Sequence, residues 1–211
     1  MYKTALLIII TTLFLADMAF AGLSFVKKTR LITKESDNVV LQQKYFSEGD
    51  MLRVEEESSG IEGNPGIKIY DFKKKKLYTI MLNVKLYLEQ DFMAEKDVVM
   101  FEPSPEKKYI IGKGLKVEKT KKGENTIEGR ITTVSEVKVV RKAEKGKEKG
   151  EQVLEKYLMW EAGELDGIPV KYEFELSGES KKIIEYVDIK TDPIDPALFS
   201  IPEGYKAISP F

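Results

Sequence analysis

The chain has 211 residues, with 34 Lys and Arg against 35 Asp and Glu and a net charge of −1, which argues against a nucleic-acid binder because such a protein carries a basic surplus. It contains no cysteine, so burial has to hold the fold without a disulfide framework. It also contains no histidine, the commonest general base and usual zinc ligand, so the composition favours a protein that is not an enzyme. Chemistry that uses carboxylates alone stays open.

The first residues are typical of a secretory signal peptide. A positive charge at Lys3 precedes an apolar stretch from Ala5 to Leu15, and Ala19 and Ala21 occupy the small-residue positions of a cleavage site. This stretch is far shorter than the roughly 20 residues that cross a bilayer. We therefore expect residues 1–21 to be removed after Ala21, the alternative being an uncleaved anchor. The mature chain, residues 22–211, is expected to be one periplasmic domain without a transmembrane segment.

From residue 22 onward the dominant pattern is alternation of apolar and polar residues, which predicts strands. Helix is a competing prediction for residues 84–96, where Leu86, Tyr87 and Gln90 also fit one helical face. The segment 126–141 is long enough to bend or bulge midway. The predicted strands are 24–33, 38–46, 50–58, 67–72, 76–82, 85–90, 115–120, 126–141, 152–162, 169–176 and 181–190.

Glycine, proline and charged clusters separate these strands. A hairpin turn is expected near Asn83, because Asn can adopt a positive φ. The segment 142–150 (KAEKGKEKG) reads as a solvated hairpin end, with a partner-docking patch as the alternative. The remaining predicted connections are polar turns at 34–37, 48–49 and 177–180, a glycine-rich loop at 60–66, an irregular stretch at 94–108 and one helical turn at 196–199.

Sequential strands with short turns predict an antiparallel meander. In 169–176, Val170, Tyr172, Phe174 and Leu176 are expected to face inward. Tyr70 and Tyr87 fall on the face assigned to solvent, and the segment 54–57 is polar on both faces, so we expect a strongly curved sheet that is filled on one stretch and loosely covered on another. Its concave apolar face is a candidate pocket for an apolar ligand, although its residues could equally be ordinary core. The candidate wall residues are Ile69, Ile80, Leu158, Trp160, Tyr172 and Phe174.

No catalytic or metal-binding motif is present in the sequence. The segment 112–114 (GKG) has neither phosphate-loop nor dinucleotide spacing and predicts a turn. Asp188, Asp192 and Asp195 lack the spacing of a calcium loop, and no serine sits in a nucleophile elbow. We therefore predict no catalytic residue, no metal and no cofactor.

Two motifs resemble a known family. Trp160 is followed by 165–171 (LDGIPVK), and the chain closes with 196–202 (PALFSIP). With these motifs, residues 24–206 resemble periplasmic domain-of-unknown-function proteins of the LolA-like superfamily, which includes outer-membrane lipoprotein carriers. The resemblance implies a mainly β fold, an incomplete, half-open antiparallel barrel partly lidded by short helices, whose concave face receives acyl chains of lipids or lipoproteins.

The chain departs from that family at one position. The carriers have an Arg-Pro pair early in the sheet, whose arginine ties the lid shut. This chain has 45–48 (YFSE) in that region and no Arg-Pro pair, and we do not transfer the lid role to Arg53, the nearest arginine. The missing Arg-Pro pair argues against a role in lipoprotein trafficking but leaves the expected fold unchanged.

The sequence therefore predicts a non-enzymatic, monomeric periplasmic protein that binds lipid or lipoprotein acyl chains. The alternative is an envelope interaction or sensor module that docks a protein partner through its sheet surface or the 142–150 segment. A carboxylate-based hydrolase is a third, weaker hypothesis.

Overall fold

A computed structural model of the chain describes residues 22–57, 66–92, 115–141, 152–165 and 167–208. The predicted signal peptide, the glycine-rich loop up to residue 65, the irregular stretch 94–108, the turn at 112–114 and the charged segment 142–150 lie outside the described residues. In the described part of the chain, no helix has the length and apolar character needed to span a membrane.

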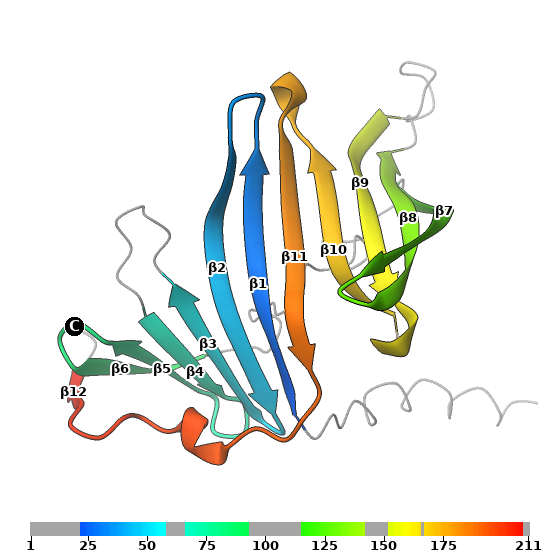
Figure 1. Cartoon of the computed structure of the whole chain (residues 1–211). Helices are drawn as coiled ribbons and strands as arrows, with labels where there is room; N and C mark the ends of the chain where they lie inside the picture. Colours follow the sequence, from blue (N-terminus) through cyan, green and yellow to red (C-terminus); the bar gives the residue numbers. More distant parts are fainter. Residues whose placement is uncertain (1–21, 58–65, 93–114, 142–151, 166, 209–211) are drawn as a thin grey trace, which may run out of the picture.

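The described strands form a single twelve-stranded sheet (Figure 1). Their alternation of apolar and polar residues suits a sheet that buries one face. The strands are β1 (Leu23–Ile32), β2 (Asp37–Glu48), β3 (Met51–Glu57), β4 (Gly66–Asp71), β5 (Lys76–Met81), β6 (Leu86–Asp91), β7 (Leu115–Ile127), β8 (Arg130–Arg141), β9 (Gln152–Ala162), β10 (Ile168–Glu175), β11 (Lys181–Lys190) and β12 (Lys206–Ile208).

Two antiparallel meanders meet side by side in this sheet, in the order β12-β6-β5-β4-β3-β2-β1-β11-β10-β9-β8-β7. The first meander runs from β1 to β6 and the second from β7 to β11. The antiparallel pair β1 and β11 joins them at the centre. The short β12 then adds to β6 as the sheet's one parallel pair. The predicted meander is therefore correct within each half.

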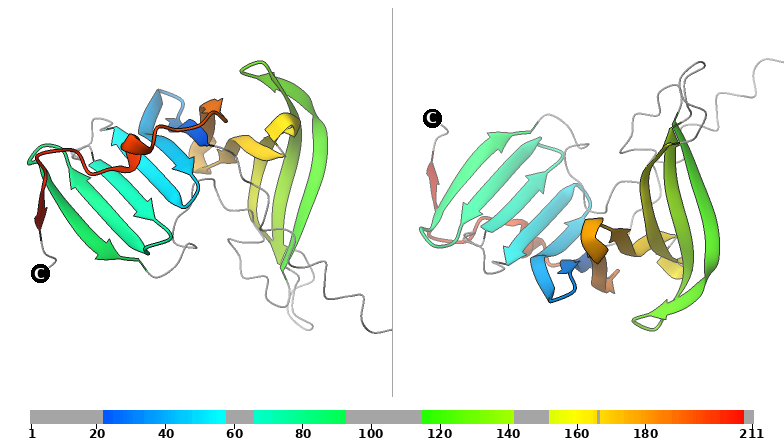
Figure 2. Two further views of the ribbon diagram at one scale, coloured as in Figure 1. Left: turned by 90° about the horizontal axis from the view of Figure 1, so that it is seen from below. Right: turned by 90° about the horizontal axis from the view of Figure 1, so that it is seen from above.

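The sheet is strongly curled and does not lie flat (Figure 2). Register shifts interrupt β1 between Ser24 and Val26, β10 between Pro169 and Lys171, and β7 between Lys121 and Gly123. Such bulges bend a strand and increase its twist. Short 3-10 turns are the only helical segments of the described residues: η2 (Gly163–Leu165), η3 (Ser177–Glu179) and η4 (Pro196–Phe199). The predicted fold class, a curved and open antiparallel sheet with few short helices, is confirmed.

Two local predictions are wrong in detail, and one alternative is excluded. The predicted strand 126–141 is correct as β8 only from Arg130, because residues 126–127 end β7 and Glu128 and Gly129 form the hairpin turn with positive φ (48° and 79°), as a tight turn of the I′ type requires. The predicted strand at 85–90 is confirmed as β6, which pairs with β5, and the competing helix is excluded over the described part of 84–96. In the turn before β6 the positive φ belongs to Lys85 and not to Asn83.

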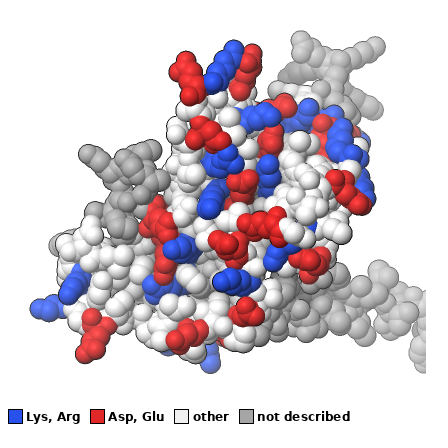
Figure 3. Space-filling model, in the orientation of Figure 1, with Lys and Arg blue, Asp and Glu red and all other residues white. Residues whose placement is uncertain are grey.

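The two faces of the sheet differ in chemistry. Strand register places Phe25, Tyr45, Tyr172 and Tyr186 on one face, which we call the aromatic face. It lies on the inside of the curl (Figure 2), away from the reader in Figure 1. The opposite face carries interspersed charges of both signs over β1, β2, β10 and β11 (Figure 3), and we call it the charged face.

Tyr70 and Tyr87 contradict the prediction that they face solvent, because both are half-buried. On the aromatic face, Tyr70 packs against the main apolar cluster, the large group of buried residues that includes Phe25, Tyr172 and Trp160. On the charged face, Tyr87 packs against a second, smaller cluster. Each face therefore buries apolar side chains somewhere along the sheet. Two further assignments fail: Val54 is buried although its segment was expected to be polar on both faces, and Leu176 lies beyond the end of β10 and is 44% exposed.

The C-terminal segment covers one end of the charged face. Phe199 of η4 and Tyr205 pack on Ile67, Ile69 and Ile80, which form the second cluster. Arg53 donates a hydrogen bond from Nη1 to the carbonyl oxygen of Leu198 at 2.6 Å. A segment after β11 is thus fixed across β3 to β6, as the red trace in Figure 1 shows.

The β7–β8 hairpin tip reaches toward the lower end of β11 (Figure 2). Arg130 donates a hydrogen bond from Nη2 to the carbonyl oxygen of Ile189 at 3.0 Å, and the Glu128 carboxylate accepts one from the backbone N–H of Asp188 at 3.2 Å. Two strands, β9 and β10, separate these partners in the sheet order. The contacts therefore stabilise the curl.

Candidate functional site

Six aromatic rings form a continuous row across the aromatic face. Tyr45 stacks on Phe25 with ring centroids 4.8 Å apart, and Phe25 meets Tyr186 edge-on at 5.6 Å. Tyr186 lies 6.3 Å from Tyr172, which in turn lies 5.9 Å from Tyr157. Phe174 completes the row, 5.0 Å from Tyr157 and 6.0 Å from Tyr172. The row crosses β2, β1, β11, β10 and β9.

Strand register explains why these rings meet. Phe25 is opposite Tyr45, and Phe174 is opposite Tyr157, so each pair points to the same side of the sheet. Ring pairs at such separations gain about 0.5–1.5 kcal/mol beyond area burial. At about 4.8 Å between neighbouring strands, the four steps from β2 to β9 span about 19 Å. The row is therefore a long, rigid apolar strip.

Burial varies along this face. Five of the six rings are at most 5% exposed (Phe25, Tyr45, Tyr157, Tyr172 and Tyr186), whereas Phe174 is only half-buried. Phe174 also lies under a cation, because the Lys182 ammonium is 5.6 Å from its ring centroid. Phe174 is thus the member of the row that a ligand could reach from outside.

A second group of rings continues the aromatic face over β4. Tyr70, Phe72 and Phe92 form a triangle with centroids 5.6–6.3 Å apart. All three are half-buried. Burial raises the pKa of the Tyr70 hydroxyl, so Tyr70 stays neutral at physiological pH. This group adds neutral apolar surface next to the row.

The six candidate wall residues lie in three places. Tyr172 and Phe174 belong to the aromatic row. Leu158 and Trp160 point to the charged face, because they are opposite Glu173 and Lys171 of β10. Ile69 and Ile80 are also on the charged face, with no exposed surface, in the cluster that Phe199 and Tyr205 cover. Of the six candidates, the structure therefore places only Tyr172 and Phe174 in the aromatic row.

Sequence reasoning missed four members of the row: Phe25, Tyr45, Tyr157 and Tyr186. Each has an apolar residue directly after it (Val26, Phe46, Leu158 and Val187), so alternation alone did not single out its face. Tyr157 precedes Leu158, so the two occupy opposite faces of β9, and choosing Leu158 and Trp160 as wall residues selected the other face. Trp160 instead packs in the main apolar cluster, with the Lys171 ammonium 4.7 Å from its ring centroid.

An open hollow of about 460 Å³ adjoins the row at the β7 edge. Its side chains are polar, in contrast to the rings beside it. Lys119 forms an ion pair with Glu161 at 2.6 Å, and Lys121 forms one with Glu124 at 2.8 Å. The lining residues are Lys119, Lys121, Thr133, Ser135, Glu161, Gly163 and Gly167.

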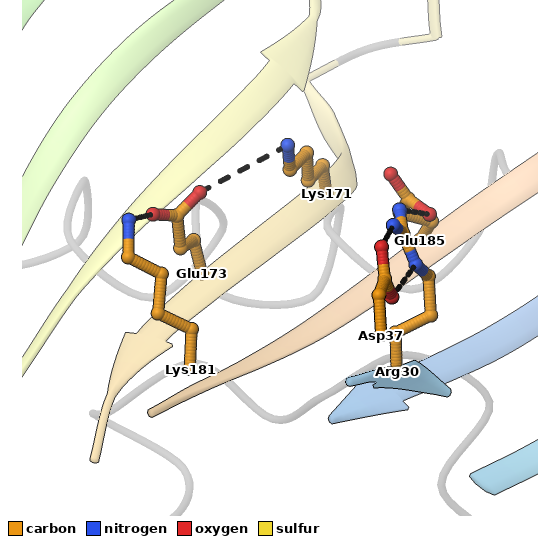
Figure 4. A network of polar contacts seen from close by, with 6 residues as sticks. All are labelled: Arg30, Asp37, Lys171, Glu173, Lys181 and Glu185. Atoms are coloured by element: carbon orange, nitrogen blue, oxygen red, sulfur yellow. Dashed lines mark hydrogen bonds and ion pairs between the residues drawn. The ribbon is translucent and has the colours of Figure 1, made fainter. Parts of the chain in front are cut away.

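The charged face carries ion-pair networks. In Figure 4, Arg30 contacts both Asp37 and Glu185, while Glu173 contacts Lys171 and Lys181. These networks lie over β1, β10 and β11, where the charges neutralise one another. They leave no surplus of one sign.

A small hollow of about 90 Å³ lies on the same face beside Leu158. Glu136 lines it and lies within 3.4 Å of Lys122, Lys138 and Lys156. Partial burial alone would raise the pKa of Glu136, but its lysine partners outweigh burial and keep the pKa below its usual range. Glu136 is therefore an ionised, neutralised carboxylate, which is unsuited to act as a general acid.

The described residues contain no group of three or more acidic, histidine or cysteine side chains that could hold a metal ion. What the arrangement offers is apolar area of defined shape with cations at its edge. Such a surface can bind and orient an amphiphile through burial and charge.

Comparisons with known proteins add a likeness of fold. No protein-family model and no curated protein matches the sequence. Among solved structures, the chain is similar to an uncharacterized conserved protein from Thermus thermophilus (12% identity, TM-score 0.48, 90% of each chain covered). It is also similar to a LolA superfamily protein from Nitrosomonas europaea (11% identity, TM-score 0.34, 85% of this chain and 90% of that chain covered). A third is the Mycobacterium tuberculosis lipoprotein LppX (12% identity, TM-score 0.41, 82% and 88% covered).

Proposed function

We propose that this protein binds the acyl chain of a lipid or lipoprotein along its aromatic face, without catalysing a reaction. The observation that carries the proposal is the uninterrupted row of six rings from Tyr45 to Tyr157. The predicted signal peptide supports a periplasmic location, where a carrier of apolar molecules would be needed.

Burial supplies the affinity in this proposal. Each methylene removed from water contributes about 0.8 kcal/mol, so a dozen methylenes yield about 10 kcal/mol before ordering costs. The row, about 19 Å long, matches an extended chain of that size in length. Since five of its rings are buried, the chain would enter beside Phe174, the half-buried ring. Rigid rings lose little side-chain entropy when a ligand packs on them, which favours such a surface over flexible aliphatic residues.

The test measures uptake of a fluorescent fatty acid by protein purified from periplasm, together with native mass spectrometry for co-purified lipid. We expect uptake by the wild type, and about tenfold weaker uptake after Phe174→Ser, because a half-buried ring contributes on the order of 1.5 kcal/mol. Leu158→Ser is the matched control: it is half-buried on the neighbouring strand but points to the charged face. Protein that carries no lipid and takes up no probe would contradict the proposal.

The alternative of a protein-docking module rests on the charged segment 142–150, which lies outside the described residues. The charged face offers no apolar patch over β1, β10 and β11 to favour it. Acyl-chain binding is therefore the function that the described geometry supports best.

A further inference from the structure

The polar hollow at the β7 edge lies in line with the aromatic row. One line of directly opposite residues runs from Tyr172 through Met159 and Ser135 to Lys121. The next runs from Phe174 through Tyr157 and Val137 to Lys119. Both lines therefore begin on rings in β10 and end on a lysine in the edge strand β7.

The chemistry changes in one direction along these lines. Tyr172, Met159 and Tyr157 are buried members of the main apolar cluster. Ser135 then introduces a hydroxyl, and the two lysines, which line the hollow of about 460 Å³, are exposed. This order, from apolar rings to cationic side chains, complements an amphiphile that has an apolar tail and an anionic head group.

We propose that Lys119 and Lys121 bind the anionic head group, carboxylate or phosphate, of an amphiphile whose tail lies on the aromatic row. This inference rests on the proposed function and specifies the ligand class and its orientation. The tail extends toward β1 and the head group occupies the hollow at β7, where it remains in contact with water.

The present partners of the lysines can be replaced. Lys119 pairs with Glu161 and Lys121 with Glu124, and both lysines are about half exposed. Exposed ion pairs contribute little, so an incoming anion can displace a carboxylate at small cost. Glu161 also lines the hollow and competes with the anion. With Glu124 and Glu161 the two lysines face two carboxylates, so an anion binds by displacing one of them.

The experiment compares two competitors for the fluorescent fatty-acid site: a long-chain fatty acid and the primary alcohol of the same chain length. For the wild type we expect the acid to bind about fivefold more tightly than the alcohol, the effect of about one exposed ion pair. In Lys119→Gln/Lys121→Gln, the ratio of the acid's affinity to the alcohol's affinity should fall to about one, while the affinity for the alcohol stays unchanged. Glu161→Gln should raise the ratio, which a purely structural role of Glu161 would not do.

Lys122→Gln/Lys138→Gln is the matched control. These two lysines lie on the same hairpin but pair with Glu136 on the charged face, so the ratio should not change. A ratio that persists in Lys119→Gln/Lys121→Gln overturns the head-group inference alone. If neither competitor nor probe binds the wild type, the proposed function itself fails.

Competition by inorganic phosphate tests whether the two lysines bind a head group or a free anion. We expect millimolar phosphate to leave the bound fatty acid in place, because the tail contributes most of the affinity. Phosphate that binds Lys119 and Lys121 as tightly as the fatty acid does would identify a free-anion site and overturn the assignment to an amphiphile.

Discussion

Ile80 is a residue whose role can be separated from ligand binding. It has no exposed surface and contacts the cluster that Phe199 and Tyr205 cover, on the face opposite the aromatic row. Ile80→Ala should lower the free energy of unfolding by about 3 kcal/mol, from lost burial and the cavity left behind. Urea unfolding measures this. Val84→Ala, in the turn that follows β5 and exposed, should change stability by less than about 0.5 kcal/mol. If Ile80→Ala protein stays folded but loses fatty-acid uptake, Ile80 would have to contact the ligand, contrary to this assignment.

Asp71 makes stability depend on pH. Burial alone would raise the pKa of Asp71, but the backbone N–H of Lys74, 2.8 Å from Oδ1, and the Lys74 ammonium, 3.0 Å from Oδ2, outweigh it and lower the pKa. A lowered pKa in the folded state stabilises the fold above the unfolded pKa of about 4, and this contribution is lost as pH falls through the folded pKa.

Asp71→Asn should therefore reduce the free energy of unfolding by about 1 kcal/mol at pH 7, and the difference from wild type should disappear at about pH 2. Urea unfolding at both pH values provides the measurement. Glu203→Gln, at an exposed turn carboxylate, is the matched control and should change the free energy of unfolding at pH 7 by less than about 0.5 kcal/mol. A difference that is the same at both pH values would show that the charge of Asp71 is not the cause.

The candidate residues show what a single strand pattern can and cannot predict. Alternation correctly separated Tyr172 and Phe174 from Lys171 and Glu173. It could not decide which face of 152–162 joins them, because Tyr157 and Met159 on one face are as apolar as Leu158 and Trp160 on the other. Only pairing with β10 resolves this: Phe174 is opposite Tyr157, and Lys171 is opposite Trp160. Register between strands carries the missing information.

The turn of the β7–β8 hairpin requires a residue in the left-handed region of backbone conformation. Gly129 has a φ of 79°, in the left-handed region where a side chain is strained. Gly129→Ala should destabilise the protein by about 1 kcal/mol, measured by urea unfolding. Gly123→Ala is a control in the same hairpin, because Gly123 does not have positive φ and an added Cβ there meets no atom within 4 Å. Equal effects of the two substitutions would contradict the role of the turn.

At the scale of elements, eleven strands could be predicted from the sequence because their alternation is regular and their turns are polar. Three features were missed for physical reasons. The Glu128–Gly129 turn lacks the Asn-Gly or Asp-Gly signature of a tight hairpin. With three residues, β12 is too short for alternation to be detected. The neighbours β1 and β11 pair through residues 149 to 166 positions apart in the sequence, which no local pattern encodes.

At the scale of the whole molecule, the two faces of one sheet are packed differently. Its aromatic face carries rings from both meanders, because β1 and β11 join the halves. The charged face is covered at one end by the C-terminal segment, and the β7–β8 hairpin tip contacts η2 and the end of β11. Apolar side chains on both faces are thus part of the core, and the aromatic face is the one on which we propose that the acyl chain binds.

The single tryptophan can report which face binds a ligand. Trp160 points to the charged face, in contact with the Lys171 ammonium, whereas Tyr157 on the same strand belongs to the aromatic row. An acyl chain labelled with bromine quenches tryptophan fluorescence only at short range. If the chain lies on the aromatic face, the labelled fatty acid should bind and leave Trp160 emission nearly unchanged, because the sheet separates the two.

The matched variant moves the reporter to the other face. Trp160→Phe/Tyr157→Trp places the only indole in the row, and its emission should be strongly quenched by the same labelled fatty acid at the same occupancy. Fatty-acid affinity, measured independently by displacement of the fluorescent probe, shows whether both proteins bind. Quenching of Trp160 in the wild type, without quenching in the variant, would place the ligand on the charged face, and the row of rings would then be core and not a binding surface.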